Sequence, residues 1–145
     1  TIRPRDINIH SALSNKKGVT DLYYLGDFSV HNTIEKNSAK LLQKYFSINK
    51  KDIKKNKIKT DRLDNILKKY KFYNIDFMSI DVEGEEIKII RSIDFQKFNI
   101  KYICIEMFNA NKKSIENNLK VVKHLKKNGY TLKDKTQINH IFKKK

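Results

Sequence analysis

Residues 75–86 read IDFMSIDVEGEE, and this stretch decides the fold. Its first six residues form a mostly apolar run of strand length, which is typical of a central strand that is covered on both faces. The run stops at Asp81, and Gly84 lies just beyond it. Glu85 and Glu86 then fall in the first turn of a helix, where carboxylates interact favourably with the positive end of the helix dipole. The stretch predicts a buried strand, an acidic turn and a helix in immediate succession.

Strand and helix patterns alternate on both sides of this stretch. Residues 61–70 place apolar side chains at i, i+3, i+4 and i+7, the spacing of one helix face, and Thr60 or Asp61 is expected to cap that helix. Residues 102–107 repeat the apolar run of a strand, and the long helix after them is expected to end at Asn128 and Gly129. The side chains expected to face the core from the three helices are Leu63, Ile66, Leu67, Tyr70, Ile87, Ile90, Ile93, Ile115, Leu119, Val122 and Leu125.

The two ends of the chain carry shorter patterns. Residues 6–13 predict a strand, residues 19–25 a second, edge strand, and residues 130–142 a closing antiparallel hairpin. Residues 28–57 are polar and are interpreted as a long loop with one short helix, and the lysine-rich residues 50–59 as an exposed connection. The alternating units predict an α/β fold, a mostly parallel sheet with helices on both faces.

Composition limits the class of protein. The chain has 145 residues, 32 Lys+Arg against 16 Asp+Glu and a net charge of +16, which fits one domain over residues 1–145. Its 39% of hydrophobic residues cluster in blocks and exclude a disordered tail, and one Cys excludes a disulfide framework or a cysteine-based zinc site. No apolar run approaches the roughly 20 residues of a membrane helix, and a cytoplasmic location is expected.

The positive net charge does not by itself indicate specific binding of nucleic acid. Most basic residues are Lys, whereas base recognition relies on the planar fork of Arg, so no specific nucleic-acid binding is expected and the Lys-rich surface is interpreted as solvated. The four His residues lack metal-ligand spacing, so no metal site is predicted. Cys104 lies within an apolar strand and is interpreted as a buried small side chain.

Acidic residues mark the ends of the central strands. Asp81 ends one strand, Glu83 lies in its turn and Glu106 lies near the end of the next strand. Ligands of open parallel sheets collect at this edge, where three carboxylates can orient hydroxyls, accept a proton or hold a cation. A structural alternative remains open, in which Glu83 interacts with the helix dipole and Asp81 bonds nearby backbone N–H groups.

A family resemblance rests on three segments: TDRLDNIL (60–67), IDFMSIDVEGEEIKIIRSI (75–93) and YICIEMF (102–108). They resemble the FkbM family of S-adenosylmethionine-dependent methyltransferases, and the upstream INIHSALSNKKG (7–18) looks like that family's third strand and the turn after it. The matching residues are Leu63, Asp64, Ile75, Asp76, Ile80, Asp81, Val82, Glu83, Gly84, Glu86 and Glu106.

The resemblance implies a partial Rossmann-like class I methyltransferase fold, whose seven strands include an antiparallel last strand. The first two strands, with the glycine-rich cofactor turn and the ribose-binding acid, are missing, so the chain is expected to be the C-terminal part of a methyltransferase domain. The implied cofactor is S-adenosylmethionine, with Ser11 and Ala12 beside its adenine ring. Asp81 is expected near the methyl donor and the acceptor, as the catalytic carboxylate, and Glu83 and Glu106 at the acceptor pocket.

The resemblance also implies O-methylation of a hydroxyl on a sugar or secondary metabolite, so the expected partner is a small-molecule or glycan acceptor. Because the glycine-rich turn is absent, these 145 residues alone are expected to be inactive. Two other readings stay open. One is a non-catalytic remnant of the methyltransferase fold, and the other is a basic module that binds polyanions through its Lys surface.

Overall fold

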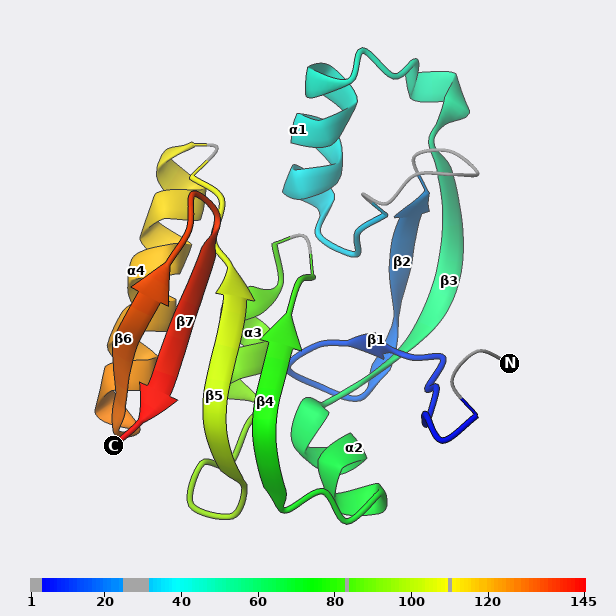
Figure 1. Ribbon diagram of the computed structural model, residues 1–145. Coiled ribbons are helices and arrows are strands. Elements are labelled where there is room, and N and C mark those ends of the chain that lie inside the picture. Colours follow the sequence, from blue (N-terminus) through cyan, green and yellow to red (C-terminus); the bar gives the residue numbers. More distant parts are fainter. Residues whose placement is uncertain (1–3, 25–31, 83, 110) are drawn as a thin grey trace.

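The strands form two separate sheets in the computed structural model, which describes residues 4–24, 32–82, 84–109 and 111–145 (Figure 1). The three-stranded sheet has the order β1-β3-β2, and the four-stranded sheet has the order β4-β5-β7-β6. The strand bounds are Ala12–Leu13 (β1), Gly18–Tyr24 (β2), Lys54–Asp61 (β3), Asn74–Ile80 (β4), Asn99–Glu106 (β5), Tyr130–Lys135 (β6) and Asn139–Lys144 (β7).

The helices lie around the four-stranded sheet and above it. In Figure 1, α3 and α4 lie behind this sheet, α2 lies beside the lower end of β4, and α1 lies above the sheet on the side of β2. Among the described helices, none is long and apolar enough to cross a membrane. The helix bounds are Lys36–Tyr45 (α1), Leu63–Lys69 (α2), Glu86–Arg91 (α3) and Lys112–Lys127 (α4), with a short 3-10 turn, η1, at Lys50–Asp52.

The expectation of a mostly parallel sheet is wrong, because both sheets are mixed. β4 and β5 are parallel, but β7 lies between β5 and β6 and runs antiparallel to both. In the other sheet β1 is parallel to β3, and β2 is antiparallel to it. The predicted C-terminal hairpin is confirmed, and it introduces the antiparallel pairs of the four-stranded sheet.

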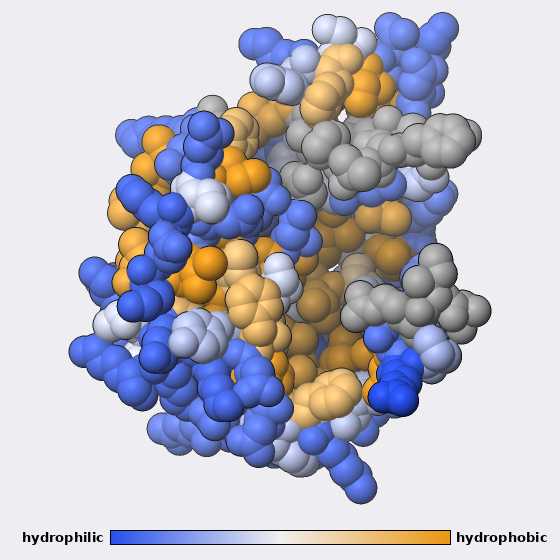
Figure 2. Space-filling model, viewed as in Figure 1, coloured by the Kyte–Doolittle hydropathy of each residue, from blue (hydrophilic) through white to orange (hydrophobic). Residues whose placement is uncertain are grey.

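The expectation of helices on both faces is also wrong for the described part of the chain. β4, β5 and β6 run parallel to one another and follow one another in one direction across the sheet. Crossovers between parallel strands are right-handed. Both crossovers therefore place their helices, α3 and α4, on one face. The opposite face is turned to the viewer in Figures 1 and 2, apolar side chains are visible in the middle of that view, and Phe77 of β4 is 56% exposed.

The hydrophobic core fills the space between the four-stranded sheet and the helices α2, α3 and α4. It confirms several of the predicted inward-facing residues. The buried members of the core are Leu63, Leu67, Ile80, Ile87, Ile89, Ile90, Ile93, Phe95, Phe98, Ile100, Ile103, Ile105, Met107, Val121, Leu125, Tyr130 and Phe142. This layer fixes β4 and β5 side by side, so that their carboxyl ends meet at one edge.

The predicted inner face of α4 is wrong over its first half. Ile115 and Leu119 are 44% and 64% exposed, whereas Val121 and Leu125 are fully buried. Val121 and Leu125 lie on the same face of α4 as Ser114, at i+7 and i+11 from it. This face is turned inward, and the face with Ile115 and Leu119 is not.

Two N-terminal predictions change in the structure. The strand expected at residues 6–13 shortens to β1, and residues 6–10 are exposed. Most of residues 50–59 are exposed as expected, but they are not a simple connection, because residues 54–59 belong to β3, which pairs with the whole length of β2. The hydrogen bonds to β2 hold this lysine-rich segment as a strand. Because side chains alternate along a strand, the Lys side chains on one face extend into solvent.

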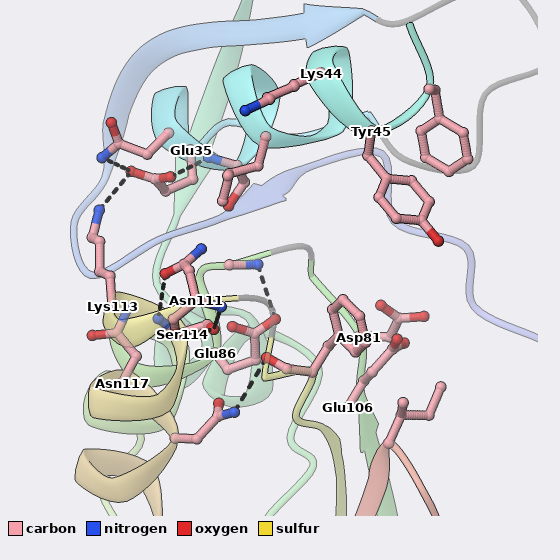
Figure 3. A pocket seen from close by; sticks show the side chains of 18 residues that line it. Glu35, Lys44, Tyr45, Asp81, Glu86, Glu106, Asn111, Lys113, Ser114 and Asn117 are labelled. Carbon is pink, nitrogen blue, oxygen red and sulfur yellow. Dashed lines mark hydrogen bonds and ion pairs between the residues drawn. The ribbon is translucent and has the colours of Figure 1, made fainter.

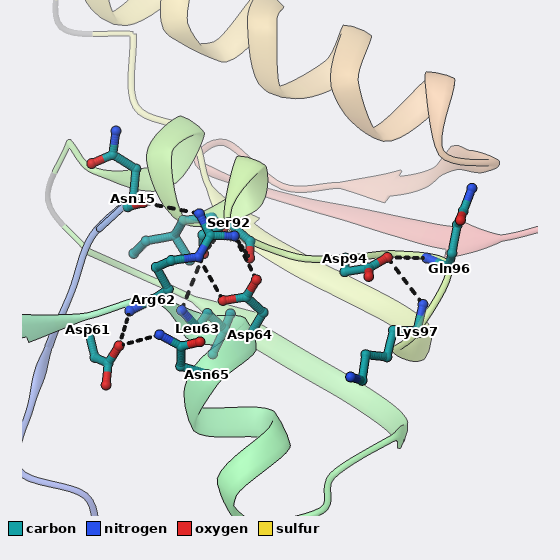
Figure 4. A network of polar contacts seen from close by, with 11 residues as sticks. Asn15, Asp61, Arg62, Leu63, Asp64, Asn65, Ser92, Asp94, Gln96 and Lys97 are labelled. Atoms are coloured by element: carbon teal, nitrogen blue, oxygen red, sulfur yellow. Dashed lines mark hydrogen bonds and ion pairs between the residues drawn. The ribbon is translucent and has the colours of Figure 1, made fainter. Parts of the chain in front are cut away.

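An Arg62 network connects the turn between β1 and β2 with α2 and α3 (Figure 4). The Arg62 guanidinium donates two hydrogen bonds to the carboxylate of Asp64 at 2.9 and 2.6 Å. It also donates to the carbonyl oxygens of Asn15, at 3.1 Å, and Ser92, at 3.0 Å. Arg62 itself is the N-cap of α2, so neither Thr60 nor Asp61 takes the predicted position.

Candidate functional site

A pocket of about 640 Å³ opens at the carboxyl ends of β4 and β5 (Figure 3). Its walls come from α1, the turn after β4, the segment after β5 and the first two turns of α4. The volume lies in the range of about 300–1,000 Å³ that small-molecule sites occupy. The lining residues are Glu35, Asn37, Ser38, Leu41, Lys44, Tyr45, Phe46, Asp81, Gly84, Glu86, Glu106, Phe108, Asn111, Lys113, Ser114, Asn117, Asn118 and Ile138.

Two carboxylates lie on one side of this pocket, at the ends of neighbouring strands. Ile80 and Ile105 are partners in the parallel register of β4 and β5, so the residues that follow them, Asp81 and Glu106, are also neighbours. Both side chains line the pocket, Asp81 exposed and Glu106 half-buried. The structure thus brings together two of the three acidic residues expected at this edge. Glu83, the third, lies outside the described residues.

α1 is anchored over the pocket by the carboxylate of Glu35. This carboxylate accepts hydrogen bonds from the backbone N–H of Ser38, at 2.6 Å, and from the amide of Asn37, at 3.2 Å. It also forms an ion pair with Lys113 of α4, at 3.4 Å across the pocket. Burial by itself would raise the pKa of Glu35, but the hydrogen bond from Ser38 and the charge of Lys113 outweigh it and lower the pKa.

Gly84 brings the turn after β4 against the start of α1. Its φ is +104°, a backbone conformation that residues with a side chain rarely adopt. A Cβ at this position would lie 2.4 Å from Oγ of Ser38. The backbone N–H of Gly84 donates to Glu86 Oε1 at 3.0 Å, which fixes the turn. A glycine is therefore required here for two reasons, the backbone angle and the close contact with α1.

The first turns of α4 form the wall opposite α1. Asn111 and Ser114 make a capping box, in which each side chain bonds the backbone N–H of the other residue. The Asn118 amide donates to Asn109 Oδ1 at 2.9 Å and so shapes the loop after β5. Among the described residues, no hydrogen bond engages the side chain of Asn117, which is free to contact a ligand.

A second, smaller cavity of about 140 Å³ lies next to the same strand end. It is lined by Leu13 of β1, by the last residues of β4 and by Val82. Asp81 lines both cavities. Ser11 and Ala12, the residues expected beside the adenine ring, line neither cavity, but Leu13 directly after them lines the smaller one.

Two acidic or nucleophilic groups stay outside both cavities. Glu85 is 2% exposed, with Oε1 2.5 Å from Lys88 Nζ, and no other described residue gives Oε2 a hydrogen-bond partner. Burial raises the pKa of the Cys104 thiol, which keeps it protonated. Among the described residues, no group of three or more His, Cys, Asp or Glu has the arrangement of a metal site.

Sequence reasoning missed the residues that α1 and α4 contribute, such as Glu35, Tyr45 and Asn117. Residues 39–46 were expected to form a helix, but nothing in their pattern indicated that it faces the strand ends. The Asn-rich segment 109–118, directly after a central strand, was the available signal, because amides at this edge are typical of ligand sites.

The chain was compared with known proteins. Residues 2–132 match the model of the family described as "Methyltransferase FkbM domain". No curated protein and no solved structure gave a significant match.

Proposed function

Because the chain belongs to the FkbM methyltransferase domain family, we propose that it serves the transfer of a methyl group from S-adenosylmethionine to a hydroxyl group of an acceptor. The acceptor occupies the 640 Å³ pocket, and the methyl donor approaches from the side of the smaller cavity. Membership of this family supports the methyltransferase class. The cofactor, the hydroxyl acceptor and the residue roles below are our proposal.

One observation carries this assignment: Asp81 lines both cavities. Methyl transfer requires the acceptor oxygen and the methyl carbon to be held in line at short distance, so the two binding sites must meet. A carboxylate at the place where they meet contacts the acceptor hydroxyl at the reacting end. Leu13 and Val82 of the smaller cavity offer apolar contacts on the donor side.

Asp81 is proposed as the residue that orients and deprotonates the hydroxyl. S-adenosylmethionine supplies a sulfonium methyl group, and the C–S bond breaks as the new O–C bond forms. The hydroxyl proton passes to the Asp81 carboxylate, and general-base assistance of this kind is worth about 10²–10⁴ in rate. Glu106 is proposed to accept a hydrogen bond from the same acceptor, since it lies next to Asp81 in the strand register.

The described residues fit only one side of a cofactor site. The smaller cavity, at about 140 Å³, lies below the range of about 300–1,000 Å³ for small-molecule sites. The chain has four glycines, and none forms a glycine-rich turn. Ser11 and Ala12 directly precede Leu13, which lines the smaller cavity, and they are proposed to lie near the adenine ring.

The arrangement of the sheets supports the further proposal that these residues are the C-terminal part of a methyltransferase domain. Among the described strands, β4 is an edge strand of its sheet, and β1 pairs with β3 alone, through two residues. Two strands of a complete domain inserted between β1 and β4 would pair both free edges. The antiparallel β7 within the other sheet agrees with the antiparallel last strand that the resemblance implies.

The proposal is tested with Asp81→Asn in the full chain that the gene encodes, with radiolabelled S-adenosylmethionine and a pool of hydroxylated acceptors. We expect the methyl-transfer rate to fall by about 10²–10⁴, while affinity for S-adenosylhomocysteine changes less than about threefold. Glu116→Gln is the control, because this exposed side chain of α4 lines neither cavity. Equal losses of rate and affinity would assign Asp81 a structural role instead.

A further inference from the structure

We propose that α1 is a lid that pivots over the 640 Å³ pocket, and that Tyr45 closes the pocket against Phe108. This inference rests on the proposed function, because it describes how the acceptor is enclosed for methyl transfer. It follows from apolar side chains of α1 that are open to solvent, from an exposed ring on the opposite wall, and from attachments of α1 that lie at one end of the helix (Figure 3).

The side of α1 that lines the pocket carries exposed apolar side chains. Five residues line the pocket from this side, at i, i+1, i+4, i+7 and i+8 of the helix: Asn37, Ser38, Leu41, Lys44 and Tyr45. Leu41 is 43% exposed and Tyr45 is 80% exposed. An amphipathic helix normally buries its apolar side, but Ala39 is the one buried side chain among those of α1 that the structure describes. The pocket side of α1 would therefore gain free energy by approaching another apolar surface.

An apolar surface of this kind lies on the opposite wall of the pocket. Phe108, after β5, is 61% exposed and lines the pocket. Among the described residues, the one ring contact of Tyr45 is with Phe46, at 5.0 Å between centroids, and none joins it to Phe108. The wall that carries Phe108 is held in place, because the backbone N–H of the buried Met107 donates to the carbonyl oxygen of Ile138 at 2.7 Å. The closing movement must therefore come from α1.

The attachments of α1 to the pocket walls lie at its first turn. Glu35, directly before α1, accepts from the backbone N–H of Ser38 and pairs with Lys113 of α4 at 3.4 Å. The turn at Gly84 also lies against Ser38. Four side chains of the later turns have no hydrogen bond or ion pair with another described residue: Lys40, Gln43, Lys44 and Tyr45. The first turn is therefore the natural pivot of the helix.

A small tilt about this pivot moves Tyr45 far. α1 has 10 residues and is about 15 Å long, so a tilt of about 20° moves its last turn by about 5 Å. Residues 46 and 47 after it are exposed and can follow the helix. Figure 3 shows Tyr45 pointing from the last turn of α1 toward the side of the pocket where Asp81 and Glu106 lie. The tilt thus brings Tyr45 toward the strand ends.

Closure encloses the acceptor next to Asp81. The open pocket admits the acceptor and water alike, whereas a closed lid excludes water and strengthens the electrostatic contact between the Asp81 carboxylate and the acceptor hydroxyl. Opening is then needed for the acceptor to enter and for the methylated product to leave.

The test is disulfide trapping in the full chain that the gene encodes, with its native cysteines, Cys104 among them, replaced by Ser. The trapped pair is Tyr45→Cys/Phe108→Cys, and the control pair is Tyr45→Cys/Phe77→Cys, because Phe77 is 56% exposed but lies on the uncovered face of β4. A disulfide requires Cα atoms about 4.4–6.8 Å apart. With copper phenanthroline and no ligand, we expect the first pair to cross-link at least about tenfold faster than the control pair. Equal rates overturn the inference.

A second pair of variants shows whether apolar contact drives the movement. Leu41→Asn, added to the trapped pair, is expected to slow cross-linking about threefold or more. Lys40→Asn is the matched control, because Lys40 is exposed on α1 and does not line the pocket. Equal rates with the two substitutions, in chains that circular dichroism shows to be folded, would mean that α1 does not close through its apolar side, and would overturn the inference.

The trapped chain also separates the lid from the proposed function. The oxidised Tyr45→Cys/Phe108→Cys chain is expected to transfer methyl groups at least about tenfold more slowly than the same chain reduced with dithiothreitol, with S-adenosylhomocysteine affinity changed less than about threefold. Equal transfer by the oxidised and reduced chains would overturn the lid. A chain that transfers no methyl group in either state contradicts the proposed function, while the cross-linking rates, measured without ligand, still decide whether α1 closes.

Discussion

Replacing Gly84 by Ala tests how α1 is seated over the pocket. The φ of +104° is unfavourable for Ala and costs about 1–3 kcal/mol. The new Cβ would lie 2.4 Å from Ser38 Oγ, whereas the next atoms, Cβ of Ser38 and of Glu35, are at 3.5 and 3.6 Å. Only the hydroxyl must therefore move, and rotating it away costs about 0.5–1.5 kcal/mol. We expect Gly84→Ala to lower the free energy of unfolding by about 2–4 kcal/mol in total.

A double-mutant cycle with Ser38→Ala separates the two contributions. In the Ser38→Ala background the clash is gone but the backbone strain stays, so Gly84→Ala should cost about 1 kcal/mol less than in the wild type. The free energies are measured by urea unfolding followed by circular dichroism. Thermal unfolding provides a second measurement, in which 1 kcal/mol corresponds to about 3–5 °C in Tm for a domain of this size. Equal costs in both backgrounds would refute the close contact between this turn and α1.

Three further predictions concern buried or half-buried groups. Lys88→Met removes the ion-pair partner of the buried Glu85 and should lower the free energy of unfolding by about 1–3 kcal/mol, with recovery in the Lys88→Met/Glu85→Met double variant, measured by urea unfolding. Burial raises the pKa of Tyr130 to about 12, and its hydroxyl donates to the Ile100 carbonyl oxygen at 2.7 Å. An absorbance titration should show a phenol that ionises near pH 12 and is lost in Tyr130→Phe, a change that should cost about 1 kcal/mol. The lowered pKa of Glu35 means that its contribution to stability is present above pH 4.5 and lost as the pH falls through the folded-state pKa. Glu35→Gln should abolish that part of the pH dependence of unfolding.

The central part of the fold was predictable because local and tertiary preferences agree there. Residues 75–80 form β4 within one residue of the prediction, and the acidic turn and α3 follow as expected. Leu63 and Leu67 face the core from α2, and the hairpin of β6 and β7 closes the chain. In these segments the apolar period and the breaks at Asp81 and Gly84 all indicate the same structure.

The sequence predictions are wrong where contacts with residues distant in the sequence determine the local structure. Residues 54–61 carry too many lysines to look like a strand, and they form β3 because β2 pairs with them. At the start of α4, Ser114 and Asn118 face inward because they line the pocket. Ile115 and Leu119 are therefore exposed. An apolar period cannot reveal a helix face that lines a polar pocket.

The site was predictable to the extent that it depends on strand ends. The places of Asp81 and Glu106 follow from the parallel register of two adjacent strands. The place of α1 does not follow from its own sequence, because it depends on contacts across the pocket, such as Glu35 with Lys113.

The most direct test of a methyltransferase site that meets at Asp81 is calorimetric titration with S-adenosylhomocysteine. It is made with these 145 residues alone and with the same chain joined to any residues that precede Thr1 in its gene. We expect saturable one-to-one binding by the longer chain, loss of that binding when Leu13→Trp fills the smaller cavity, and little or no binding by the 145 residues alone. A folded longer chain that binds no S-adenosylhomocysteine would contradict the account and favour a non-catalytic remnant of the fold.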